Sequence, residues 1–377
     1  MLEKAKNIFF VGIGGIGISA IARVLLASGR QISGSELSTS EITNDLEQLG
    51  IKIFYGHSET NLPPDADLVI YSAAIPPENP ERLKALSLNI PELSYPEALG
   101  QFAKGKKVIA IAGTNGKTTT TAMIATILEN AGEDPTAIVG SKVLAWNSNA
   151  RVGKGEYLIL EADEYRRAFL HYHPDKAVIT NIEPDHLDYY RDLDDIKRAF
   201  VEFAKNIKSG GALVYNLDNP NAREIAASVH CHKISFGFSE EAEVDPVFLE
   251  DAKLQVPGYF NLSNAMAAAA VCQNIGLSQL EIIEGLNNFR GTWRRFQNLG
   301  KFGNADIISD YAHHPDGVRV TLEAAAEFYR GKRVLVVFQP HQHNRTKLLF
   351  QDFVTSFSTS HLNHFLFAEI FDVAGRE

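Results

Sequence analysis

The chain has 377 residues, of which 45% are hydrophobic and 22% charged, and this composition is typical of a globular protein and excludes a largely disordered one. At roughly 150 residues per domain, the length predicts two or three compact units. The 46 acidic residues outnumber the 36 basic ones and give a net charge of −10, which argues against a broad nucleic-acid-binding surface. Any phosphate that the protein binds should therefore be held locally.

The predicted elements follow one another in the order expected for parallel sheets covered by helices. Short apolar runs alternate with amphipathic stretches through almost the whole chain, so the predicted fold class is α/β. The first unit has three predicted strands and one predicted helix, the strands at 8–11, 31–33 and 68–71 and the helix at 16–27. This unit is expected to end within 95–107, where residues 105–107 (GKK) are typical of a polar linker.

The second unit begins with a predicted strand at 108–112 and the long helix that follows Lys117. Its other predicted elements are strands at 157–160, 177–180 and 212–215 and helices at 195–206 and 263–274. A second linker is expected at 291–303, and the third unit has predicted strands at 306–309, 333–338 and 364–370. Only about 75 residues remain for this third unit, fewer than most doubly wound domains need, so we expect either that the chain is a fragment or that its last domain is abbreviated.

The cysteines and the hydropathy of the chain bear on its compartment. Its two cysteines, Cys231 and Cys272, are too few for a disulfide framework and are typical of a reducing cytosol. His230 and His232 flank Cys231, but neighbouring residues on a strand point to opposite faces, so we favour a structural segment over a zinc site. We also expect neither a signal peptide nor a membrane-spanning segment. The sequence thus predicts a cytoplasmic protein.

The first predicted strand leads into a glycine-rich sequence, GIGGIG at 12–17, in which Gly12, Gly14 and Gly17 fit the pattern G-x-G-x-x-G. Such glycines allow a tight turn and let backbone N–H groups reach a diphosphate at the start of the following helix. Glu36, about 20 residues further on, could accept a hydrogen bond from a ribose hydroxyl. A dinucleotide and another diphosphate nucleotide are equally good candidate ligands, and a purely structural turn is a weaker alternative.

A second glycine-rich segment, GTNGKTTT at 113–120, also lies between a predicted strand and a predicted helix. It is a shortened relative of the phosphate loop G-x-x-x-x-G-K-[ST], because Ile111 stands at the first glycine position. Backbone N–H groups and the Lys117 ammonium should bind the β- and γ-phosphates of a nucleotide, and the Thr118 hydroxyl should ligate Mg²⁺. The run of threonines supports this interpretation, since β-branched residues are poor helix formers.

Acidic residues follow two strands of the second unit, in EADEY at 161–165 and in EPDHLD at 183–188. Because the carboxyl ends of parallel strands meet at one edge of a sheet, both segments should lie beside the phosphate loop. Glu161 is the best candidate for a Mg²⁺ ligand, and His186 is a candidate metal or substrate ligand. Together the two segments predict a magnesium–nucleotide site.

The third unit carries two further polar segments, DYAHHP at 310–315 and QPH at 339–341, each at the end of a predicted strand. Arg345 lies at the start of the next predicted helix, where the helix N-terminus and the guanidinium could hold a carboxylate. His313 and His314 could instead be capping or packing groups. The residues alone do not decide between a ligand site and a structural role.

Taken together, these motifs resemble those of the Mur ligases, the ATP-dependent amide-forming enzymes of peptidoglycan precursor synthesis. The resemblance covers nearly the whole chain. It depends on GIGGIGISAIA at 12–22, SAAIPPENPE at 72–81, GTNGKTTT at 113–120, EADEY at 161–165, DHLD at 185–188, Asn261 with Asn264, WRRF at 293–296, DYAHHP at 310–315, and FQPH at 338–341 with Arg345. Within the family, the motifs look most like those of the branch that joins L-alanine to UDP-N-acetylmuramate.

The resemblance implies three domains: a Rossmann-like UDP-sugar-binding domain at 1–104, a central ATP-binding domain with a phosphate loop and a parallel sheet at 105–298, and a partial Rossmann-like amino-acid-binding domain at 299–377. The first glycine loop would then hold the diphosphate of a UDP-sugar, not a nicotinamide cofactor. The implied substrate-binding residues of this domain are Gly12, Gly14, Gly15, Gly17, Glu36 and Ser72.

For the other two domains, the resemblance implies ATP and Mg²⁺ as cofactors. The implied nucleotide-binding residues are Gly113, Thr114, Asn115, Gly116, Lys117, Thr118, Thr119, Asn264 at the adenine, Arg295 at the phosphates and Asp310 at the ribose. Thr118 and Glu161 would hold one Mg²⁺ and His186 a second. His313, His341 and Arg345 would shape the amino-acid site, and the implied catalytic residues are Lys117, His186, His313 and Arg345.

The implied reaction passes through an acyl phosphate, formed on the lactyl carboxylate of the muramate and then attacked by the amine of alanine. The sequence departs from the pattern of that branch at Asn115, Arg166, Phe260 and Gln342. Gln342 stands where many relatives have an arginine for the amino acid's carboxylate, which leaves Arg345 as the expected clamp. The alternatives are a ligase that attaches a preformed tripeptide to the same UDP-sugar, a nucleotide-binding protein that has lost catalysis and, as an outsider, an NAD-dependent oxidoreductase.

Overall fold

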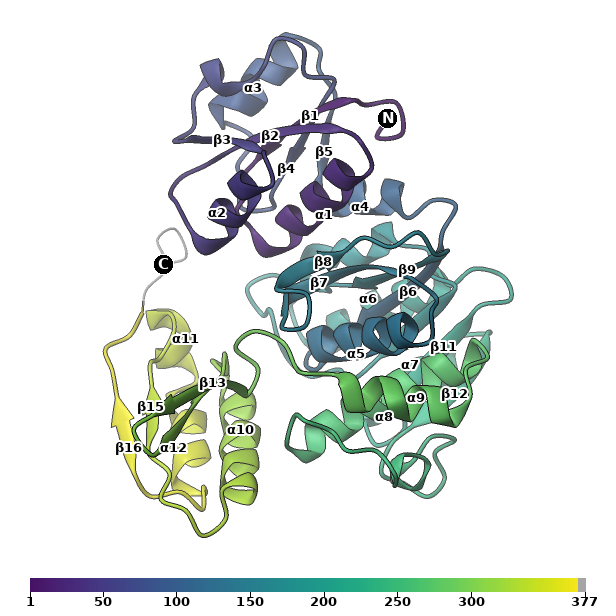
Figure 1. The fold of residues 1–377 in the computed structure, drawn as a ribbon, viewed down its shortest axis with the longest axis vertical. Helices are drawn as coiled ribbons and strands as arrows, with labels where there is room; N and C mark the ends of the chain where they lie inside the picture. Colours follow the sequence, from purple (N-terminus) through teal and green to yellow (C-terminus); the bar gives the residue numbers. More distant parts are fainter. Residues whose placement is uncertain (372–377) are drawn as a thin grey trace.

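The computed structural model describes residues 1–371, which form three α/β units that follow one another along the chain (Figure 1). The first unit is built on five parallel strands in the order β3-β2-β1-β4-β5. These strands are β1 (Asn7–Val11), β2 (Gln31–Glu36), β3 (Lys52–Tyr55), β4 (Leu68–Tyr71) and β5 (Glu92–Ser94). Because β1 lies in the middle and is covered on both faces, its sequence NIFFV is almost continuously apolar.

The helices of the first unit are α1 (Ile16–Ala27), α2 (Glu41–Gln48), η1 (Glu59–Asn61), α3 (Pro80–Ser87) and α4 (Tyr95–Phe102). β1 pairs with β2 on one side and with β4 on the other, so the strand order reverses at β1. Ligands of open α/β sheets bind at such a reversal, beyond the carboxyl ends of the strands. The glycine-rich segment 12–17 lies at this position, between β1 and α1.

The central unit has a seven-stranded sheet in the order β12-β11-β10-β6-β9-β7-β8. Its strands are β6 (Lys107–Ala112), β7 (Thr136–Val143), β8 (Ser148–Arg151), β9 (Tyr157–Glu161), β10 (Lys176–Ile179), β11 (Ala212–Asn216) and β12 (His232–Phe236). All neighbouring pairs are parallel except β7 and β8, which form an antiparallel edge. The phosphate-loop sequence follows β6, and the segments EADEY and EPDHLD follow its two neighbours, β9 and β10.

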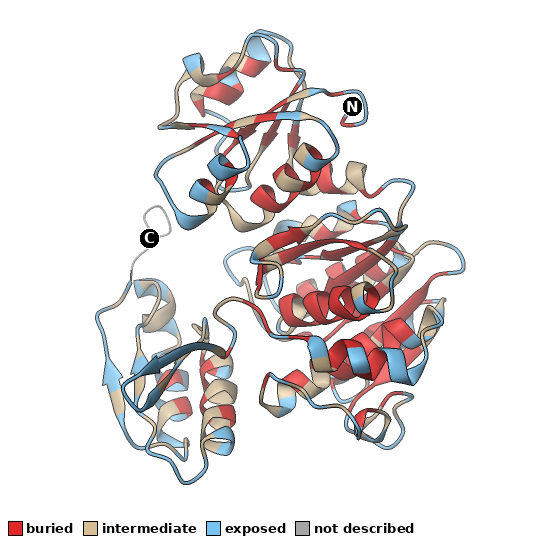
Figure 2. Cartoon of the chain, viewed as in Figure 1, coloured by how far each residue is buried: buried red, intermediate tan, exposed pale blue. Residues whose placement is uncertain are grey.

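The helices of the central unit are α5 (Lys117–Asn130), η2 (Tyr165–His171), α6 (Leu193–Lys205), α7 (Pro220–Ser228), η3 (Pro246–Leu249), α8 (Tyr259–Asn274) and α9 (Gln279–Asn288). α5 is buried along nearly its whole length, in contact with β7, α8 and α9 (Figure 2). Two of its buried threonine hydroxyls bond within the helix: Thr121 and Thr126 donate to the carbonyls of Lys117 and Ala122, both at 2.8 Å. A buried helix can therefore tolerate these β-branched residues.

The third unit is smaller and more exposed than the other two (Figure 2). It comprises β13 (Gln297–Phe302), β14 (Ala305–Ser309), α10 (Pro315–Phe328), β15 (Val336–Phe338), α11 (His343–Leu348), α12 (Phe350–Ser358) and β16 (Phe365–Phe367). β13 and β14 are antiparallel, and β15 and β16 are parallel. Its buried core consists of Val318, Leu322 and Phe353. The last six residues of the expected third domain, 372–377, lie outside the described residues.

The structure confirms the α/β class and corrects several expected elements. The first expected linker, 105–107, overlaps the start of β6 at Lys107, and the segment 95–102 before it forms the helix α4, which packs with apolar residues of both neighbouring units. The second, 291–303, contains β13, and Thr292 makes a β-bridge to Val143 of β7. The expected strands 333–338 and 364–370 are reduced to three residues each, in β15 and β16. The linkers were predicted from local polarity and the strands from apolar runs. Neither signal locates the end of a strand, because that depends on the strand with which it pairs.

The hydrophobic clusters show how the units are joined. One cluster runs through the first and central units without a break, from Ile18 and Leu99 to Phe169 and Phe200. The core of the third unit is a separate cluster. The first two units therefore share buried apolar surface, whereas the third is joined to them through the chain segment around 291–296 and its contacts.

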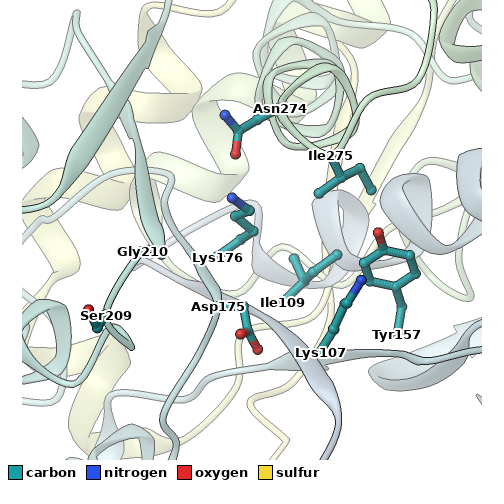
Figure 3. A pocket seen from close by; sticks show the side chains of 10 residues that line it. Lys107, Ile109, Tyr157, Asp175, Lys176, Ser209, Gly210, Asn274 and Ile275 are labelled. Carbon is teal, nitrogen blue, oxygen red and sulfur yellow. The ribbon is translucent and has the colours of Figure 1, made fainter.

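A cavity of about 310 Å³ lies at the amino ends of β6, β9 and β10, lined by Lys107, Tyr157, Lys176 and Asn274 among others (Figure 3). This is the edge of the central sheet opposite the phosphate loop, so the cavity is not part of the site described below. Within residues 1–371, we find no helix with the length and apolar character needed to span a bilayer.

Candidate active site

The phosphate-loop sequence forms a tight turn between β6 and α5. Gly113 and Gly116 have φ angles of 137° and 86°, which residues with a side chain rarely adopt. A Cβ on Gly116 would lie 2.3 Å from the Asn264 side-chain oxygen, and one on Gly113 would lie 2.0 Å from the Thr180 hydroxyl. Both positions therefore require glycine. α5 has no side-chain cap, so the N–H groups of its first turn are available to an anion.

Residues after β10 hold the turn in place. The N–H of Thr114 donates to the Asn181 carbonyl, and that of Asn115 to the Asn181 side-chain oxygen, both at 2.9 Å. The Thr180 hydroxyl donates to the Asn115 carbonyl at 2.6 Å, and the Glu183 N–H donates to the Thr114 hydroxyl at 2.9 Å. The segment that leads to DHLD is thus fixed directly against the phosphate loop, as the sequence predicts.

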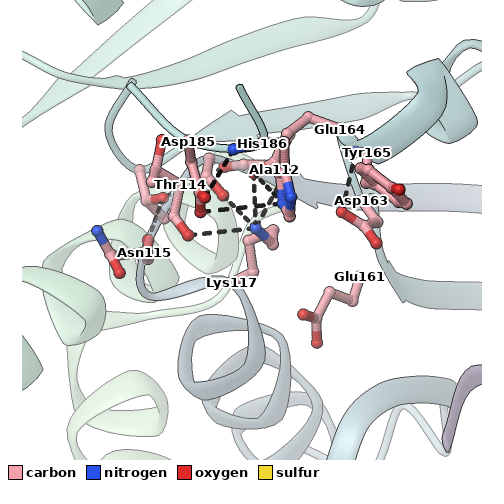
Figure 4. Close-up of polar contacts among 12 residues, drawn as sticks. Ala112, Thr114, Asn115, Lys117, Glu161, Asp163, Glu164, Tyr165, Asp185 and His186 are labelled. Atoms are coloured by element: carbon pink, nitrogen blue, oxygen red, sulfur yellow. Dashed lines mark hydrogen bonds and ion pairs between the residues drawn. The ribbon is translucent and has the colours of Figure 1, made fainter. Parts of the chain in front are cut away.

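Lys117 lies at the centre of the site (Figure 4). Its ammonium donates to the Gly113 carbonyl at 2.5 Å, to the Thr114 carbonyl at 3.3 Å and to both Glu164 oxygens at 3.1 and 2.9 Å. Burial disfavours the charged ammonium, but Glu164, Asp163 and Glu161 outweigh this effect and raise the pKa of Lys117. Lys117 is therefore a fixed positive charge at neutral pH.

Glu161, the last residue of β9, faces the first turn of α5. The Thr118 hydroxyl donates to its two oxygens at 3.1 and 3.0 Å, and the Gly140 N–H donates to Oε2 at 2.8 Å. Burial raises the pKa of Glu161, against the effects of Lys117 and of these donors. The structure thus brings together Thr118 and Glu161, the two residues expected to share a metal ion.

His186 comes together with a different pair of carboxylates. One ligand atom each of Asp163, Glu164 and His186 lies within 4.8 Å of the other two. His186 adopts a left-handed backbone conformation, with φ of 52°, and its ring lies 4.8 Å from that of Tyr165. Burial and the charge of Asp163 raise the pKa of Glu164 to about 7, although Lys117 opposes the shift.

The charges at this edge of the sheet fit a divalent cation. Three carboxylates, those of Glu161, Asp163 and Glu164, act on a single buried ammonium, that of Lys117. The donor set of carboxylates, a threonine hydroxyl and a histidine is one that Mg²⁺ can use, although it prefers oxygen ligands. The residues present therefore fit the magnesium ions that the sequence predicts.

The other expected nucleotide contacts lie at two places. Asn264 and Thr119 are buried beside the phosphate loop, where the Thr120 hydroxyl donates to the Asn264 side-chain oxygen at 3.3 Å. Asp310 lies in the third unit and accepts the N–H groups of Phe296 and Ala312 at 2.7 and 2.8 Å. Arg295 is exposed, with its guanidinium 5.7 Å from the centre of the Tyr311 ring. Their expected roles remain predictions.

The glycine loop of the first unit is supported by two of the expected substrate-binding residues. Glu36 accepts the N–H groups of Gly14 and Leu37, both at 2.8 Å. Gly12 has a φ of 75°, and a Cβ there would lie 3.2 Å from Cβ of Ser72. Gly15 caps α1 without a side-chain hydrogen bond, so the N–H groups of this helix start are also available to an anion.

We expect Gly17→Ala to weaken binding at this loop, because a Cβ would lie 2.9 Å from ring atoms of Tyr95. The crowding should lower the free energy of unfolding by about 1–3 kcal/mol and raise KM for the substrate of this unit. Gly317→Ala is a matched control, since its Cβ would have no neighbour nearer than 3.7 Å. Chemical unfolding and steady-state kinetics measure both effects, and equal behaviour of the two variants would contradict the prediction.

The expected amino-acid-binding residues gather in the third unit. The rings of His313 and His341 lie 6.0 Å apart, and Nδ1 of His313 lies 2.8 Å from the Tyr311 carbonyl. Arg345 lies in the six-residue α11, near enough to His313 to affect its titration. The start of α11 has no side-chain cap, and the role of Arg345 as the carboxylate clamp stays a prediction.

His313 should stay neutral at physiological pH and destabilise the fold in acid. Burial lowers its pKa to about 4, and the charges of Arg345 and Arg295 act in the same direction. An unfolded histidine titrates near 6.5, so between pH 6.5 and 4 the unfolded chain binds more protons and stability falls. Because the ring is partly exposed, we expect a loss of about 1 kcal/mol from pH 7.5 to 5. Urea unfolding should show no such loss in His313→Gln, whereas His314→Gln should behave like the wild type.

Sequence reasoning did not single out Glu164, the direct partner of Lys117. It lies in the quoted segment EADEY, and only the turn after β9 decides that Glu164 is buried while Asp163 is exposed. Lys142 was also missed. It is a buried lysine on β7 whose partners, Glu41 and Asp45, lie 101 and 97 residues away in the chain. No local sequence signal could have found that contact.

A phosphate loop followed by metal-binding carboxylates in a central sheet, between a glycine-loop domain and a small third domain, defines a class of nucleotide-dependent α/β enzymes. Comparison with known proteins makes the class specific. The "Mur ligase family, catalytic domain" matches residues 7–107, the "Mur ligase middle domain" 111–272 and the "Mur ligase, glutamate ligase domain" 294–370. The chain belongs to the Mur ligase family, whose members are ATP-dependent, amide-forming ligases.

Named relatives and solved structures agree with this assignment. The chain is 42% identical over 369 residues to the UDP-N-acetylmuramate–L-alanine ligase of Sulfurihydrogenibium sp. (strain YO3AOP1), with 94% of this chain and 81% of the relative covered. It is 44% identical over 370 residues to the ligase of the same name from Carboxydothermus hydrogenoformans, with 93% and 80% covered. The crystal structure of UDP-N-acetylmuramate-alanine ligase MurC from Thermotoga maritima has a TM-score of 0.81 at 28% identity, with 98% of this chain and 96% of that chain covered.

These findings confirm the expected family, the three-domain α/β fold and the class of enzyme. The chain belongs to a ligase family, so the oxidoreductase alternative is wrong. Which diphosphate nucleotide the glycine loop binds stays a prediction. The G-x-G-x-x-G pattern describes how a backbone approaches a diphosphate and carries no information about the rest of the ligand.

Proposed function

We propose that the protein joins L-alanine to the lactyl carboxylate of UDP-N-acetylmuramate, with ATP converted to ADP and phosphate and with Mg²⁺ as cofactor. The names of relatives that are 40–44% identical over nearly the whole chain support this substrate pair. The observation that carries the proposal is the buried Lys117 ammonium on the phosphate loop, flanked by Glu161 and by the group of Asp163, Glu164 and His186. We also propose a cytoplasmic location, which its two free cysteines support.

The three units divide the task in this proposal. Residues 1–104 bind the UDP-sugar at the glycine loop, residues 105–298 bind ATP, and residues 299–377 bind the amino acid. In the first unit, Gly12, Gly14, Gly15 and Gly17 approach the diphosphate closely, and Glu36 and Ser72 support the loop. In the third unit, His313, which is neutral, shapes the amino-acid site together with His341 and Arg345. Arg345 holds the carboxylate of the amino acid.

The chemistry follows from the charges of the central site. A carboxylate is a poor electrophile, so the lactyl group is activated by transfer of the γ-phosphoryl group and becomes an acyl phosphate. Lys117 and the first-turn N–H groups of α5 stabilise the charge on the phosphoryl oxygens during this transfer. The free amine of alanine then attacks the acyl carbon, and phosphate leaves. Closure of the third unit over the central one would exclude water, which would otherwise hydrolyse the acyl phosphate.

Several side chains have separate tasks in this scheme. Thr118 and Glu161 would hold one magnesium ion, and His186 with Asp163 and Glu164 a second. When bound, the ions neutralise phosphate charge and act as Lewis acids. Asn264 faces the adenine, and the third-unit residues Arg295 and Asp310 reach the nucleotide when that unit closes. Glu164 holds Lys117 in place through a bidentate contact.

The experiment that tests the proposal is phosphate release by the purified chain with ATP and Mg²⁺. We expect release only when UDP-N-acetylmuramate and L-alanine are both present, with UDP-N-acetylmuramoyl-L-alanine as the product in mass spectrometry. Release with a tripeptide but not with alanine would instead identify a recycling ligase. That activity is named for a Neisseria meningitides protein whose structure is similar at 26% identity and a TM-score of 0.70. Nucleotide binding without any release would contradict a catalytic role.

A further inference from the structure

The β7–β8 hairpin of the central unit makes the polar contacts that join it to the glycine-loop unit. Lys142 of β7 is buried, and its ammonium donates to Glu41 at 2.6 Å and to Asp45 at 2.7 Å, both on α2. Asn149 of β8 is also buried, and its amide donates to the Ile16 carbonyl at 2.5 Å and to the Ser19 hydroxyl at 2.9 Å. We call Lys142 and Asn149 the hairpin latch.

Both contacts of the latch reach the edge of the glycine loop. Ile16 is the first residue of α1 and lies inside the segment 12–17. α2 lies against the loop as well, because Cγ2 of its Thr43 is 3.1 Å from the position of a Cβ on Gly14. The latch therefore holds the two helices that flank the loop, and it does so from the central unit. In Figure 1, α1 lies directly above the β7–β8 edge of the central sheet, with α2 beside it.

β7 also contacts Glu161, the proposed metal ligand, and Trp293, in the segment that leads into the third unit. The N–H of Gly140, two residues before Lys142, donates to Glu161 at 2.8 Å. The Ser141 hydroxyl donates to the Trp293 carbonyl at 3.0 Å, and the Trp293 N–H donates to the Lys142 carbonyl at 2.8 Å. The Lys142 ammonium itself lies 5.8 Å from the centre of the Trp293 ring. Residues 140–142 thus contact the glycine-loop unit, Glu161 and the segment that leads into the third unit.

We propose that Lys142 is a positioning residue for the reaction: its contact with Glu41 and Asp45 sets the glycine-loop unit, and with it the bound sugar nucleotide, at the distance from the phosphate loop that phosphoryl transfer needs. The inference rests on the proposed function. The proposed function gives Lys142 no contact with ATP or with the UDP-sugar, so it acts through α2 and β7. The Lys142 ammonium is the buried side of this contact, so losing the two carboxylates leaves it without a counter-charge, whereas Glu41 is exposed and Asp45 also lies 3.6 Å from Arg23.

A positioning role predicts a specific kinetic signature. A displacement of about 1 Å between reacting groups can lower the rate up to about 100-fold while each ligand still binds its own unit. We therefore expect Lys142→Met to lower kcat by about 10- to 100-fold. The dissociation constants for UDP-N-acetylmuramate and for a non-hydrolysable ATP analogue should change by less than about threefold. Lys142→Arg should recover most of the activity, since a guanidinium can reach both carboxylates.

Three further variants separate positioning from general stability. Glu41→Gln combined with Asp45→Asn should reproduce the loss seen in Lys142→Met, and the combination of all three changes should be no worse, because the residues act as one contact. Arg151→Met is the matched control: Arg151 bonds Glu129 and Asp134 within the central unit only. It should lose stability without the change in kcat. All rates are measured well below the unfolding midpoint of each variant.

The outcomes distinguish the inference from the proposed function. If the wild type ligates and Lys142→Met keeps its kcat within about twofold, or if Arg151→Met loses as much, the positioning role is wrong and the function stands. Independent, additive losses in the combined variant would also contradict it. A wild type that releases no phosphate with any amino acid or tripeptide would overturn the proposed function and, with it, this inference.

Discussion

Lys117→Ala should lower kcat for phosphate release by at least about two orders of magnitude, the size of effect expected when a preorganised charge is removed from a transition state. The ammonium is held by two loop carbonyls and by Glu164, so it is in place before any substrate arrives. Its charge is not lost at any physiological pH, because the surrounding carboxylates raise its pKa. Stopped-flow or coupled-assay measurement of phosphate gives the rate.

Loss of fold must be separated from loss of catalysis in this variant. Without Lys117, Glu164 stays buried with no counter-ion, and its proton occupancy should rise because its pKa is already about 7. Lys208→Met is the matched control, since Lys208 also bonds a carboxylate and a backbone carbonyl, those of Asp175 and Lys106, at the opposite edge of the sheet. Near-normal turnover in Lys117→Ala would contradict the role given to this residue.

Glu161→Gln should lower kcat by about 100-fold and raise the Mg²⁺ concentration needed for half-maximal activity by about tenfold or more. Glutamine has the same shape and can still accept from Thr118 and Gly140, so the phosphate loop should keep its conformation. Burial raises the pKa of the glutamate, so replacing it should leave the free energy of unfolding unchanged or higher. Titration of activity with MgCl₂ measures the shift.

The control for this experiment is the residue just before the same strand. Glu156→Gln makes the same chemical change next to the amino end of β9, where the exposed Glu156 pairs with Lys107. We expect its activity and its Mg²⁺ dependence to match the wild type. If Glu161→Gln kept both values as well, Glu161 could not be a metal ligand.

The parts of the fold that the sequence predicted well are those with strong local signals. β4 and α1 have the predicted bounds, because a buried apolar run ends at a turn in the first case and glycines precede an apolar helix in the second. The phosphate loop was predicted with its flanking strand and helix, since glycine, lysine and threonine at fixed spacing have few structural alternatives. These signals need no knowledge of tertiary contacts.

The predictions failed where a local sequence signal was overlooked or where the structure depends on a distant contact. α4 was not predicted, because the segment 95–107 was interpreted only as the place where the first unit ends. Yet Ser94 and Glu97 form a capping box, a helix-start signal visible in the sequence. The same limit applies to the site. Which carboxylate of EADEY contacts Lys117 depends on the turn after β9, and the Lys142 contact depends on how two domains dock.

The continuous apolar cluster shared by the first two units has a consequence for how substrates enter. Sliding these units past each other would expose side chains such as Leu99 and Phe169 to water, at a cost of roughly 1.5–3 kcal/mol for each one fully exposed. The third unit shares none of this cluster, so moving it about residues 291–296 would expose none of these side chains. We therefore expect the sugar nucleotide to dock on a rigid platform, and the amino acid to be delivered by the swinging unit.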